Sequence, residues 1–384
     1  MTGISIPSSI SRVEVYLLRA PLDVPFRTSF AVMSSRAVVL LRLEDADGYY
    51  GWGETWSTFP PCGPEHRYNL LETIVAPLLL GQSFENPKQG FDMLTQRTQV
   101  IRLQADEPGP LDQTISCADI ALWDLAARRA GVPLRSVLGS ADNATVKTYA
   151  SGVNHPGIAE TFARAREKGY RRFKIKFAFG EKQDFQNLAE AYNSMEKGEE
   201  LAIDANQGWD LSTALDQARK LQDYPLLWIE EPLRCNRPLG EWRELASISR
   251  IPLAAGENLR SRESFTAAVN SGALGVVQPD ICKWGGLSTC KDLAVEILRA
   301  KRRYCPHFLG SGIGLLASAN LLASVGGDGL LEVDCTPNPM RELLAQPFPA
   351  VKEGNLHLPD APGLGVDPDL EGAKKYVTRH KEVR

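Results

Sequence analysis

Eight short apolar segments follow one another after about residue 140, and a stretch with helical periodicity separates most neighbouring pairs. They read VKTYASG (146–152), RRFKIKFAFG (171–180), ELAIDANQG (200–208), LLWIEEPL (226–233), IPLAAGENL (251–259), ALGVVQPDICK (273–283), RRYCPHFLG (302–310) and GLLEVDC (329–335). Such alternation is typical of parallel strands joined by helical crossovers. Because eight units close a barrel, the pattern predicts an α/β fold of the (β/α)8 or TIM-barrel type.

The first 140 residues follow another pattern. Apolar and polar residues alternate in 11–20 and 37–54, where DADG (45–48) predicts a hairpin turn. Helical periodicity follows in 65–80, 86–101 and 112–131, and Gly131 is a signal for a helix end. We expect an α+β domain over 1–140, the barrel over 141–340, and a turn-rich segment, 341–384, that returns to the first domain.

Composition excludes several classes of protein. Of the 384 residues, 43% are hydrophobic and 23% charged, which is typical of globular chains. A net charge of −4, with no basic run, argues against a nucleic-acid partner. No membrane-spanning run or secretion signal stands out, and the seven cysteines are scattered without a CxxC pair, which argues against a zinc site. We therefore expect a cytoplasmic protein with reduced thiols.

Polar residues end the predicted barrel strands. The set comprises Lys174, Lys176, Asp204, Asn206, Glu230, Glu257, Asp280, His307 and Glu332. From Asp204 onward the acids and the histidine recur at intervals of 23 to 27 residues, about one per barrel unit. Since the carboxyl ends of barrel strands form the active-site mouth, these side chains should converge there.

Three consecutive strands supply carboxylates, at Asp204, Glu230 and Glu257. Like charges this close would raise one another's pKa sharply unless a cation neutralised them. Oxygen-only ligands favour a hard divalent ion, so the three are predicted to bind Mg²⁺. The alternative is that each carboxylate pairs with a nearby lysine or arginine.

Lys174 and Lys176 lie two residues apart on a strand and hence on the same face. A neighbouring ammonium group and a nearby metal ion would lower the pKa of Lys176 and make it a base, while Lys174 holds an anionic oxygen. The alternative is a pair of lysines that extend from the strand end to solvent.

His307 is one of five histidines, and a lone histidine is more often structural than catalytic. Asp280, one strand earlier, changes this interpretation because a carboxylate can fix the imidazole tautomer. Two bases facing each other across a metal-bound substrate suit removal of a proton from the carbon next to a carboxylate.

Two further stretches are ambiguous. The glycine-rich GSGIGLL (310–316) lacks the GxGxxG spacing, so a tight turn is favoured over a nucleotide cradle. TWSTFPPCGP (55–64) fits either a substrate lid or a rigid surface turn.

Taken in order, the motifs KIK, DANQ, IEEP, GEN, PDICKWGG and CPH resemble the enolase superfamily and, within it, the mandelate racemase subgroup. GWGE, ADIALWDLAARRAGVPLRSVLG and LPDAPGLGVD extend the resemblance over nearly the whole chain. It implies Mg²⁺ on Asp204, Glu230 and Glu257. It also implies roles for the other mouth residues: bases at Lys176 and His307, a substrate-carboxylate contact at Lys174, an orienting acid at Asp280, an acid that hydrogen-bonds the substrate carboxylate at Glu332, and a polar substrate contact at Asn206.

The resemblance further implies that the first domain caps the barrel and selects the substrate through two loops, 24–35 and 55–64. Arg27 could meet a second carboxylate, while Trp56 and Phe59 make that end less polar than a polyhydroxy acid prefers. A homo-oligomer is implied as well.

These inferences together predict a magnesium-dependent enzyme that removes the α-proton of a small carboxylate. Dehydration of an acid sugar or related 2-hydroxy acid through an enediolate is the first candidate, as in a lyase of the dehydratase type. A racemase or epimerase with two-base 1,1-proton transfer is the second. A cycloisomerase ranks third because position 280, where the muconate-lactonising subgroup has a lysine, is acidic, and Lys283 is not its equivalent. A barrel that binds a carboxylate without turnover is the alternative from another class.

Overall fold

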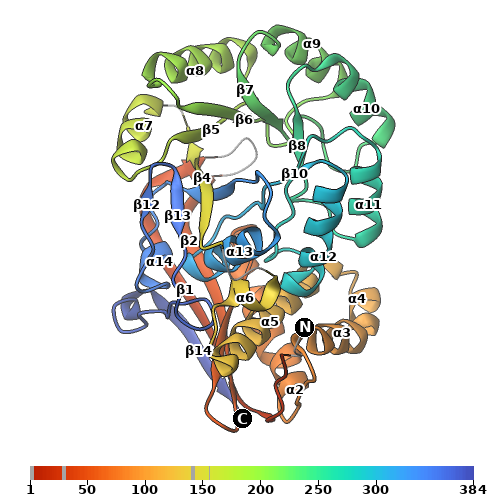
Figure 1. Ribbon diagram of the computed structural model, residues 1–384, viewed down its shortest axis with the longest axis vertical. Helices are drawn as coiled ribbons and strands as arrows, with labels where there is room; N and C mark the ends of the chain where they lie inside the picture. Colours follow the sequence, from red (N-terminus) through yellow and green to blue (C-terminus); the bar gives the residue numbers. More distant parts are fainter. Residues whose placement is uncertain (1–3, 28–31, 140–142, 155) are drawn as a thin grey trace.

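The computed structural model describes residues 4–27, 32–139, 143–154 and 156–384. A barrel and a smaller domain that holds both chain ends lie against each other (Figure 1).

The barrel consists of eight parallel strands in the hydrogen-bonded order β11, β4, β5, β6, β7, β8, β9, β10. They are β4 (Thr145–Val153), β5 (Arg172–Lys176), β6 (Glu200–Asp204), β7 (Leu226–Glu230), β8 (Leu253–Ala255), β9 (Val276–Val277), β10 (Arg303–Tyr304) and β11 (Leu331–Asp334). Each of the eight apolar segments overlaps one of them, so the predicted (β/α)8 barrel is confirmed.

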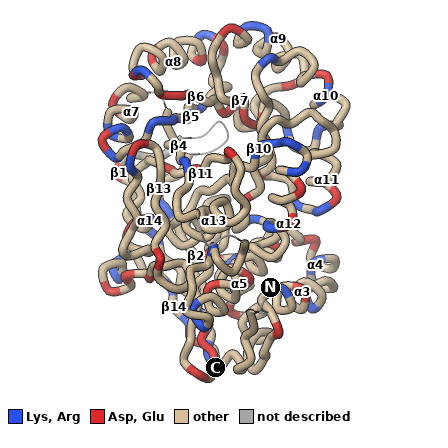
Figure 2. The backbone as a smooth tube through the Cα atoms, viewed as in Figure 1, with Lys and Arg blue, Asp and Glu red and all other residues tan. Residues whose placement is uncertain are grey.

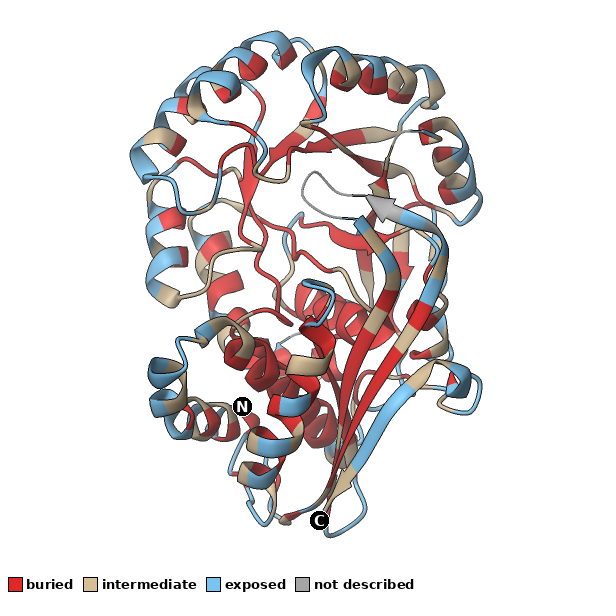
Figure 3. Cartoon of the chain, turned by 180° about the vertical axis from the view of Figure 1, so that it is seen from behind, coloured by how far each residue is buried: buried red, intermediate tan, exposed pale blue. Residues whose placement is uncertain are grey.

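Helices surround these strands (Figure 1). They are α7 (Ile158–Glu167), α8 (Glu181–Ser194), α9 (Leu211–Leu221), α10 (Leu239–Ile248), α11 (Arg262–Asn270), α12 (Gly286–Arg299), α13 (Gly312–Val325) and α14 (Pro339–Leu343). The outer helices bury one side and expose the other (Figure 3), and residues of both charges alternate along them (Figure 2). Local signals set their starts; Asp210, for example, caps α9 by accepting a hydrogen bond from the backbone N–H of Thr213.

The smaller domain contains an antiparallel sheet in the order β14, β1, β2, β3. Its strands are β1 (Ile10–Arg27), β2 (Val32–Asp45), β3 (Tyr50–Thr55) and β14 (Val377–Val383). Its helical part comprises α1 (Gly63–Leu70), a π-helical turn (Leu71–Val75), α2 (Ala76–Leu79), α3 (Pro87–Arg97), α4 (Gln99–Gln104), α5 (Pro108–Ala130) and α6 (Leu134–Leu138). The predicted hairpin joins β2 to β3, and Gly131 ends α5 in the left-handed conformation with φ 69°.

The chain after β11 contacts both the barrel and the smaller domain. The hairpin of β12 (Val351–Lys352) and β13 (Asn355–His357) pairs with β4, and a short 3-10 helix (Lys374–Tyr376) precedes β14, which pairs with β1. Between them, the backbone N–H of Leu364 donates to Asp124 of α5, and Asp367 forms an ion pair with Arg128. The C-terminal segment therefore ties the barrel to the smaller domain.

All seven cysteines are free thiols. In the described part of the chain, none of the helices combines the length and apolar character needed to span a lipid bilayer.

The contact of β3 with α5 requires glycine. A Cβ atom on Gly53 would lie 1.9 Å from the carbonyl oxygen of Cys117, so the two backbones are too close for any side chain. We expect Gly53→Ala to reduce the free energy of unfolding by about 1–3 kcal/mol or more, because overpacking forces backbone shifts. Urea denaturation measures this. Gly240→Ala is the control, since a Cβ there meets nothing within 4 Å; equal stability of the two variants would contradict the close-approach argument.

Candidate active site

A layer of apolar side chains inside the barrel forms the floor of the site. It comprises Tyr149, Ala202, Trp228, Ala254, Val276, Cys305 and Leu330. Side chains two residues apart on a strand share a face, so Asp204 follows Ala202 on β6 and Glu230 follows Trp228 on β7. His307 and Glu332 lie two residues after Cys305 and Leu330. The apolar alternation of the strands therefore places the polar set directly above a packed core, at the carboxyl ends of the strands.

The two lysines of β5 reach the same carboxylate, as expected for one face. Lys176 Nζ lies 2.6 Å from Asp204 Oδ2, and Lys174 Nζ lies 3.6 Å from the same atom. Lys174 also contacts Glu230 Oε1 at 2.5 Å and Glu332 Oε1 at 2.9 Å. Its side chain is 1% exposed, so extension to solvent is wrong for Lys174.

Without a metal ion, the contacts of Lys176 raise its pKa. The expected fall depends on a nearby metal ion as well as on Lys174, and it stays a prediction. Burial lowers this pKa, but the hydrogen-bonded Asp204 carboxylate raises it, and the lowering by Lys174 is too small to offset that attraction. The net direction is upward. Lys176 can act as a base only when the charge around Asp204 is redistributed.

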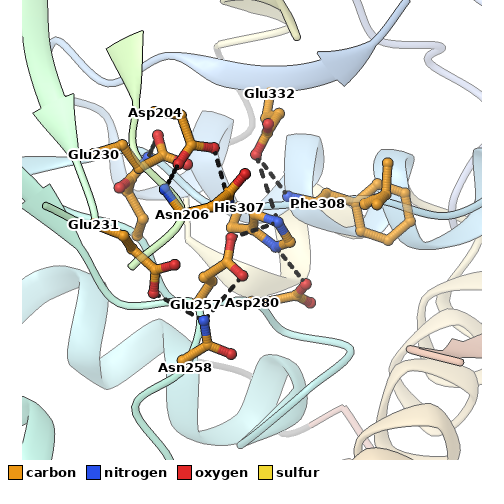
Figure 4. Close-up of polar contacts among 12 residues, drawn as sticks. Asp204, Asn206, Glu230, Glu231, Glu257, Asn258, Asp280, His307, Phe308 and Glu332 are labelled. Atoms are coloured by element: carbon orange, nitrogen blue, oxygen red, sulfur yellow. Dashed lines mark hydrogen bonds and ion pairs between the residues drawn. The ribbon is translucent and has the colours of Figure 1, made fainter. Parts of the chain in front are cut away.

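The three carboxylates predicted to bind a metal all contact cations. Glu257 Oε2 lies 2.8 Å from His307 Nε2, and Lys174 lies within reach of both Asp204 and Glu230. Figure 4 shows these acids facing the same space. Among the described residues, no three acidic, histidine or cysteine side chains form a cluster that could hold an ion as they stand. The alternative of carboxylate–cation pairing thus describes their present contacts, and the metal role stays a prediction.

Both carboxylate oxygens of Glu230 have partners. Its Oε2 accepts hydrogen bonds from Trp228 Nε1 at 3.0 Å and Gln278 Nε2 at 2.6 Å, while Lys174 contacts its Oε1. Burial raises the pKa of Glu230 to about 7, against the opposing effect of Lys174. A carboxylate so deeply buried would gain from a stronger positive charge than a shared lysine provides.

Asp280 and His307 form the predicted pair. Asp280 Oδ2 lies 2.7 Å from His307 Nδ1, and Oδ1 accepts a hydrogen bond from the backbone N–H of Cys282 at 2.8 Å. Burial lowers the pKa of His307, but Glu257, Glu332 and Asp280 outweigh it and raise the pKa well above its usual value. His307 Nε2 therefore points toward the carboxylates of the mouth and holds a proton in this arrangement.

Glu332 of β11 lies near both Lys174 and His307. Besides its contact with Lys174, its Oε2 lies 4.0 Å from His307 Nε2 and accepts a hydrogen bond from the backbone N–H of Phe308 at 3.3 Å. Burial raises the pKa of Glu332, but the positive charges of Lys174 and His307 lower it by more, so the net effect is a lowered pKa.

The other residues predicted to contact the substrate differ in how close they lie to the mouth. Asn206 donates to Asp204 Oδ2 through Nδ2 at 3.2 Å, beside the expected metal position. Trp56 is half-buried and meets the barrel, whereas Phe59 is 37% exposed at the start of the following turn. The side chain of Arg27 lies outside the described part of the structure.

Sequence reasoning missed Lys283, which is 3% exposed. Its Nζ lies 3.2 Å from Glu257 Oε1, 3.4 Å from Asn258 Oδ1 and 4.7 Å from the centre of the Trp56 ring. In the sequence, Lys283 stands out only as a residue that is not equivalent to the base lysine of the related subgroup. It lies in the turn after Asp280, and strand periodicity does not predict that this turn brings its side chain to the mouth.

The charges of the mouth suit a divalent cation. Six carboxyl groups, counting Glu231 (2% exposed) with the five predicted acids, meet three lysines and one histidine. The carboxyl groups thus outnumber the cationic groups, and burial raises the pKa of both Glu230 and Glu231. A divalent cation, which binds oxygen ligands, would favour the ionised form of the acids around it.

Comparisons with known proteins identify the family of this chain. The family model for the mandelate racemase/muconate lactonizing enzyme N-terminal domain matches residues 12–139, and that for the enolase C-terminal domain-like family matches 157–373. The D-galactarolactone cycloisomerase of Agrobacterium fabrum is 29% identical over 383 residues, which span 96% of this chain and 98% of that protein.

Two solved structures extend the likeness. A mandelate racemase/muconate lactonizing enzyme from Bordetella bronchiseptica RB50 is 45% identical with a TM-score of 0.89, covering 97% of this chain and 99% of that one. The L-talarate/galactarate dehydratase from Salmonella typhimurium LT2, solved with Mg and L-lyxarohydroxamate, is 25% identical with a TM-score of 0.86, covering 100% and 95%. The chain belongs to the mandelate racemase subgroup of the enolase superfamily.

Proposed function

We propose that this protein is a magnesium-dependent enzyme that removes the α-proton of a small hydroxycarboxylate, and that its reaction is the dehydration of an acid sugar. The supporting observation is that Lys176 and the Asp280–His307 pair both meet the same group of carboxylates at the barrel mouth. A site for binding alone would have no use for two base candidates. The sugar-acid names of the relatives support the substrate class.

Asp204, Glu230 and Glu257 would hold the ion. When bound, Mg²⁺ supplies positive charge that favours the negative charge developing on the substrate carboxylate. The ion would take over the neutralisation of Asp204 and Glu230 that Lys174 now provides. Lys174, 2.9 Å from Glu332, is then available to donate to the substrate carboxylate. Glu332 would donate to that carboxylate only in its protonated form, so binding of the negatively charged substrate must raise its pKa.

In dehydration, one base takes the proton from the carbon next to the carboxylate, and the C–H electron pair passes into the enediolate. That pair then forms the carbon–carbon double bond of an enol as the C–O bond at the next carbon breaks. The imidazolium of His307 gives its proton to the departing hydroxide, so water leaves and the enol becomes a 2-keto-3-deoxy acid. Asp280 stabilises this imidazolium.

Racemisation or epimerisation is the second candidate, and the presence of two base candidates supports it. The second base would then return a proton to the opposite face of the same carbon. Cycloisomerisation ranks third, because the residue at the position of the lactonising lysine is Asp280.

One experiment separates these outcomes. The protein is incubated with Mg²⁺ and a library of acid sugars and α-hydroxy acids in D₂O, and products are followed by NMR. We expect α-hydrogen exchange and a 2-keto-3-deoxy product. Deuterated substrate of inverted configuration would indicate racemisation instead, and a lactone would indicate cycloisomerisation. No exchange with any acid of the library would favour a carboxylate-binding protein and overturn the proposal.

A further inference from the structure

The glycine-rich segment 310–316 binds a carboxylate of the other domain. Glu54, at the end of β3, is 2% exposed and accepts hydrogen bonds at the first turn of α13. The donors are the backbone N–H of Ser311 at 2.6 Å, the Ser311 hydroxyl at 2.7 Å and the backbone N–H of Gly314 at 2.8 Å. An acid at a helix start is stabilised by the free N–H groups there. This helix begins five residues after His307.

The next residues of the same strand end reach the segment that carries Asp280. The backbone N–H of Trp56 donates to the carbonyl of Cys282 at 3.1 Å. Cys282 in turn donates to Asp280 Oδ1, and Asp280 Oδ2 contacts His307 Nδ1. Residues 54–56 thus contact both barrel segments that form the acid–histidine pair.

The loop expected to cover the substrate continues directly from this strand end. Thr58, in that loop, donates through Oγ1 to the carbonyl of Leu309 at 3.4 Å, two residues after His307. Glu54 and Thr58 therefore connect the start of this loop to the chain around His307.

We propose that Glu54 is a positioning residue: it keeps the His307 ring at hydrogen-bonding distance from Asp280. It also connects the loop expected to cover the substrate, 55–64, to His307. The inference rests on the proposed function, because it assigns His307 one face of the substrate. Small displacements of a catalytic group can reduce a rate about 100-fold, and loss of an orienting partner costs about 10- to 100-fold.

Another buried acid provides a matched control. Asp124 is fully buried and accepts from the backbone N–H groups of Trp52 at 2.9 Å and Leu364 at 2.7 Å, joining the C-terminal segment to the smaller domain. Neither of these partners belongs to the hydrogen-bond chain that leads to His307. Asp124→Asn therefore perturbs a buried contact between parts of the chain without touching the base.

The test compares Glu54→Gln, Asp124→Asn and the natural protein. Burial raises the pKa of Glu54 to about 7, with a smaller contribution from Asp280, so assays are run at about pH 8.5, where the carboxylate is ionised. In Glu54→Gln an amide N–H₂ group must face backbone N–H donors. We expect α-hydrogen exchange at the face served by His307 to fall about 10- to 100-fold, and exchange at the Lys176 face to stay within about 3-fold. The face of the substrate at which His307→Asn abolishes exchange is the one that His307 serves.

A second readout needs neither metal nor substrate. The proton between His307 Nδ1 and Asp280, identified by its loss in His307→Asn, should shift in the NMR spectrum of Glu54→Gln and not in that of Asp124→Asn. If Glu54→Gln does not fold, Ser311→Ala removes one of the three hydrogen bonds, and the same face preference is expected with a smaller loss. Equal loss at both faces, or an unmoved Nδ1 proton, would overturn the inference. Absence of exchange in the natural protein would instead overturn the proposed function.

Discussion

Lys176→Ala and His307→Asn should each abolish α-hydrogen exchange at one face of the substrate and spare the other. A positioned general base contributes about 10²- to 10⁴-fold to proton transfer, so this is the loss expected at the affected face. The reason is geometric: Lys176 ends β5 and His307 follows β10, with β11 and β4 between these strands on one side of the barrel and β6 to β9 on the other. Two C2 epimers of the substrate acid, each incubated in D₂O, report the two faces separately.

The matched control for this pair is Arg172→Ala. Arg172 belongs to the same strand as Lys176 but forms its ion pair with Glu200, 2.6 Å away, at the amino end of the strands. Exchange should be unchanged in this variant. If Lys176→Ala and His307→Asn slowed the same epimer, or slowed neither, the assignment of two opposed bases would be wrong.

Glu230→Gln should weaken magnesium binding by at least about 100-fold, since even a residue that only orients a ligand costs about 10- to 100-fold when removed. The neighbouring carboxylate offers a close comparison. Glu231 is equally buried, but its Oε1 accepts from Asn258 at 2.8 Å, and it is not among the predicted ligands. Glu231→Gln should therefore weaken binding by less than about 10-fold. Isothermal titration with Mg²⁺ in metal-free buffer measures both.

If Glu231→Gln weakened Mg²⁺ binding more than Glu230→Gln, Glu231 would be assigned as the ligand in place of Glu230. Equal and small effects would mean that Mg²⁺ does not bind between β6 and β8. Thermal denaturation of each variant in EDTA shows whether a loss of Mg²⁺ affinity comes from the missing ligand or from a destabilised fold.

Most of the barrel could be predicted from the sequence because parallel strands are apolar on both faces and end in loops with a polar residue. This regularity also predicted that Lys176, Asp204, Asp280 and His307 converge at the mouth, since strand ends of one barrel converge, and it paired Asp280 with His307. Alternation by two residues was sufficient to place Lys174 and Lys176 on one face, and in the structure both lie near Asp204 Oδ2.

Contacts between the domains could not be predicted in the same way. Glu54 and Ser311 are 257 residues apart, and nothing in a local pattern indicates that a strand end of one domain meets a helix start of the other. Lys283 was missed because it lies in a turn, where periodicity gives no direction. The contact of Lys176 with Asp204, at 2.6 Å, raises the pKa of the lysine in the absence of a metal ion, and no spacing rule predicts that contact.

The most direct test is a crystal structure with Mn²⁺ in place of Mg²⁺, in which anomalous scattering locates the ion. We expect one ion bound by Asp204, Glu230 and Glu257, with the ammonium group of Lys174 withdrawn from Glu230. An ion held elsewhere, or one that leaves the contact between Lys174 and Glu230 intact, would contradict the proposed metal site and the chemistry that depends on it.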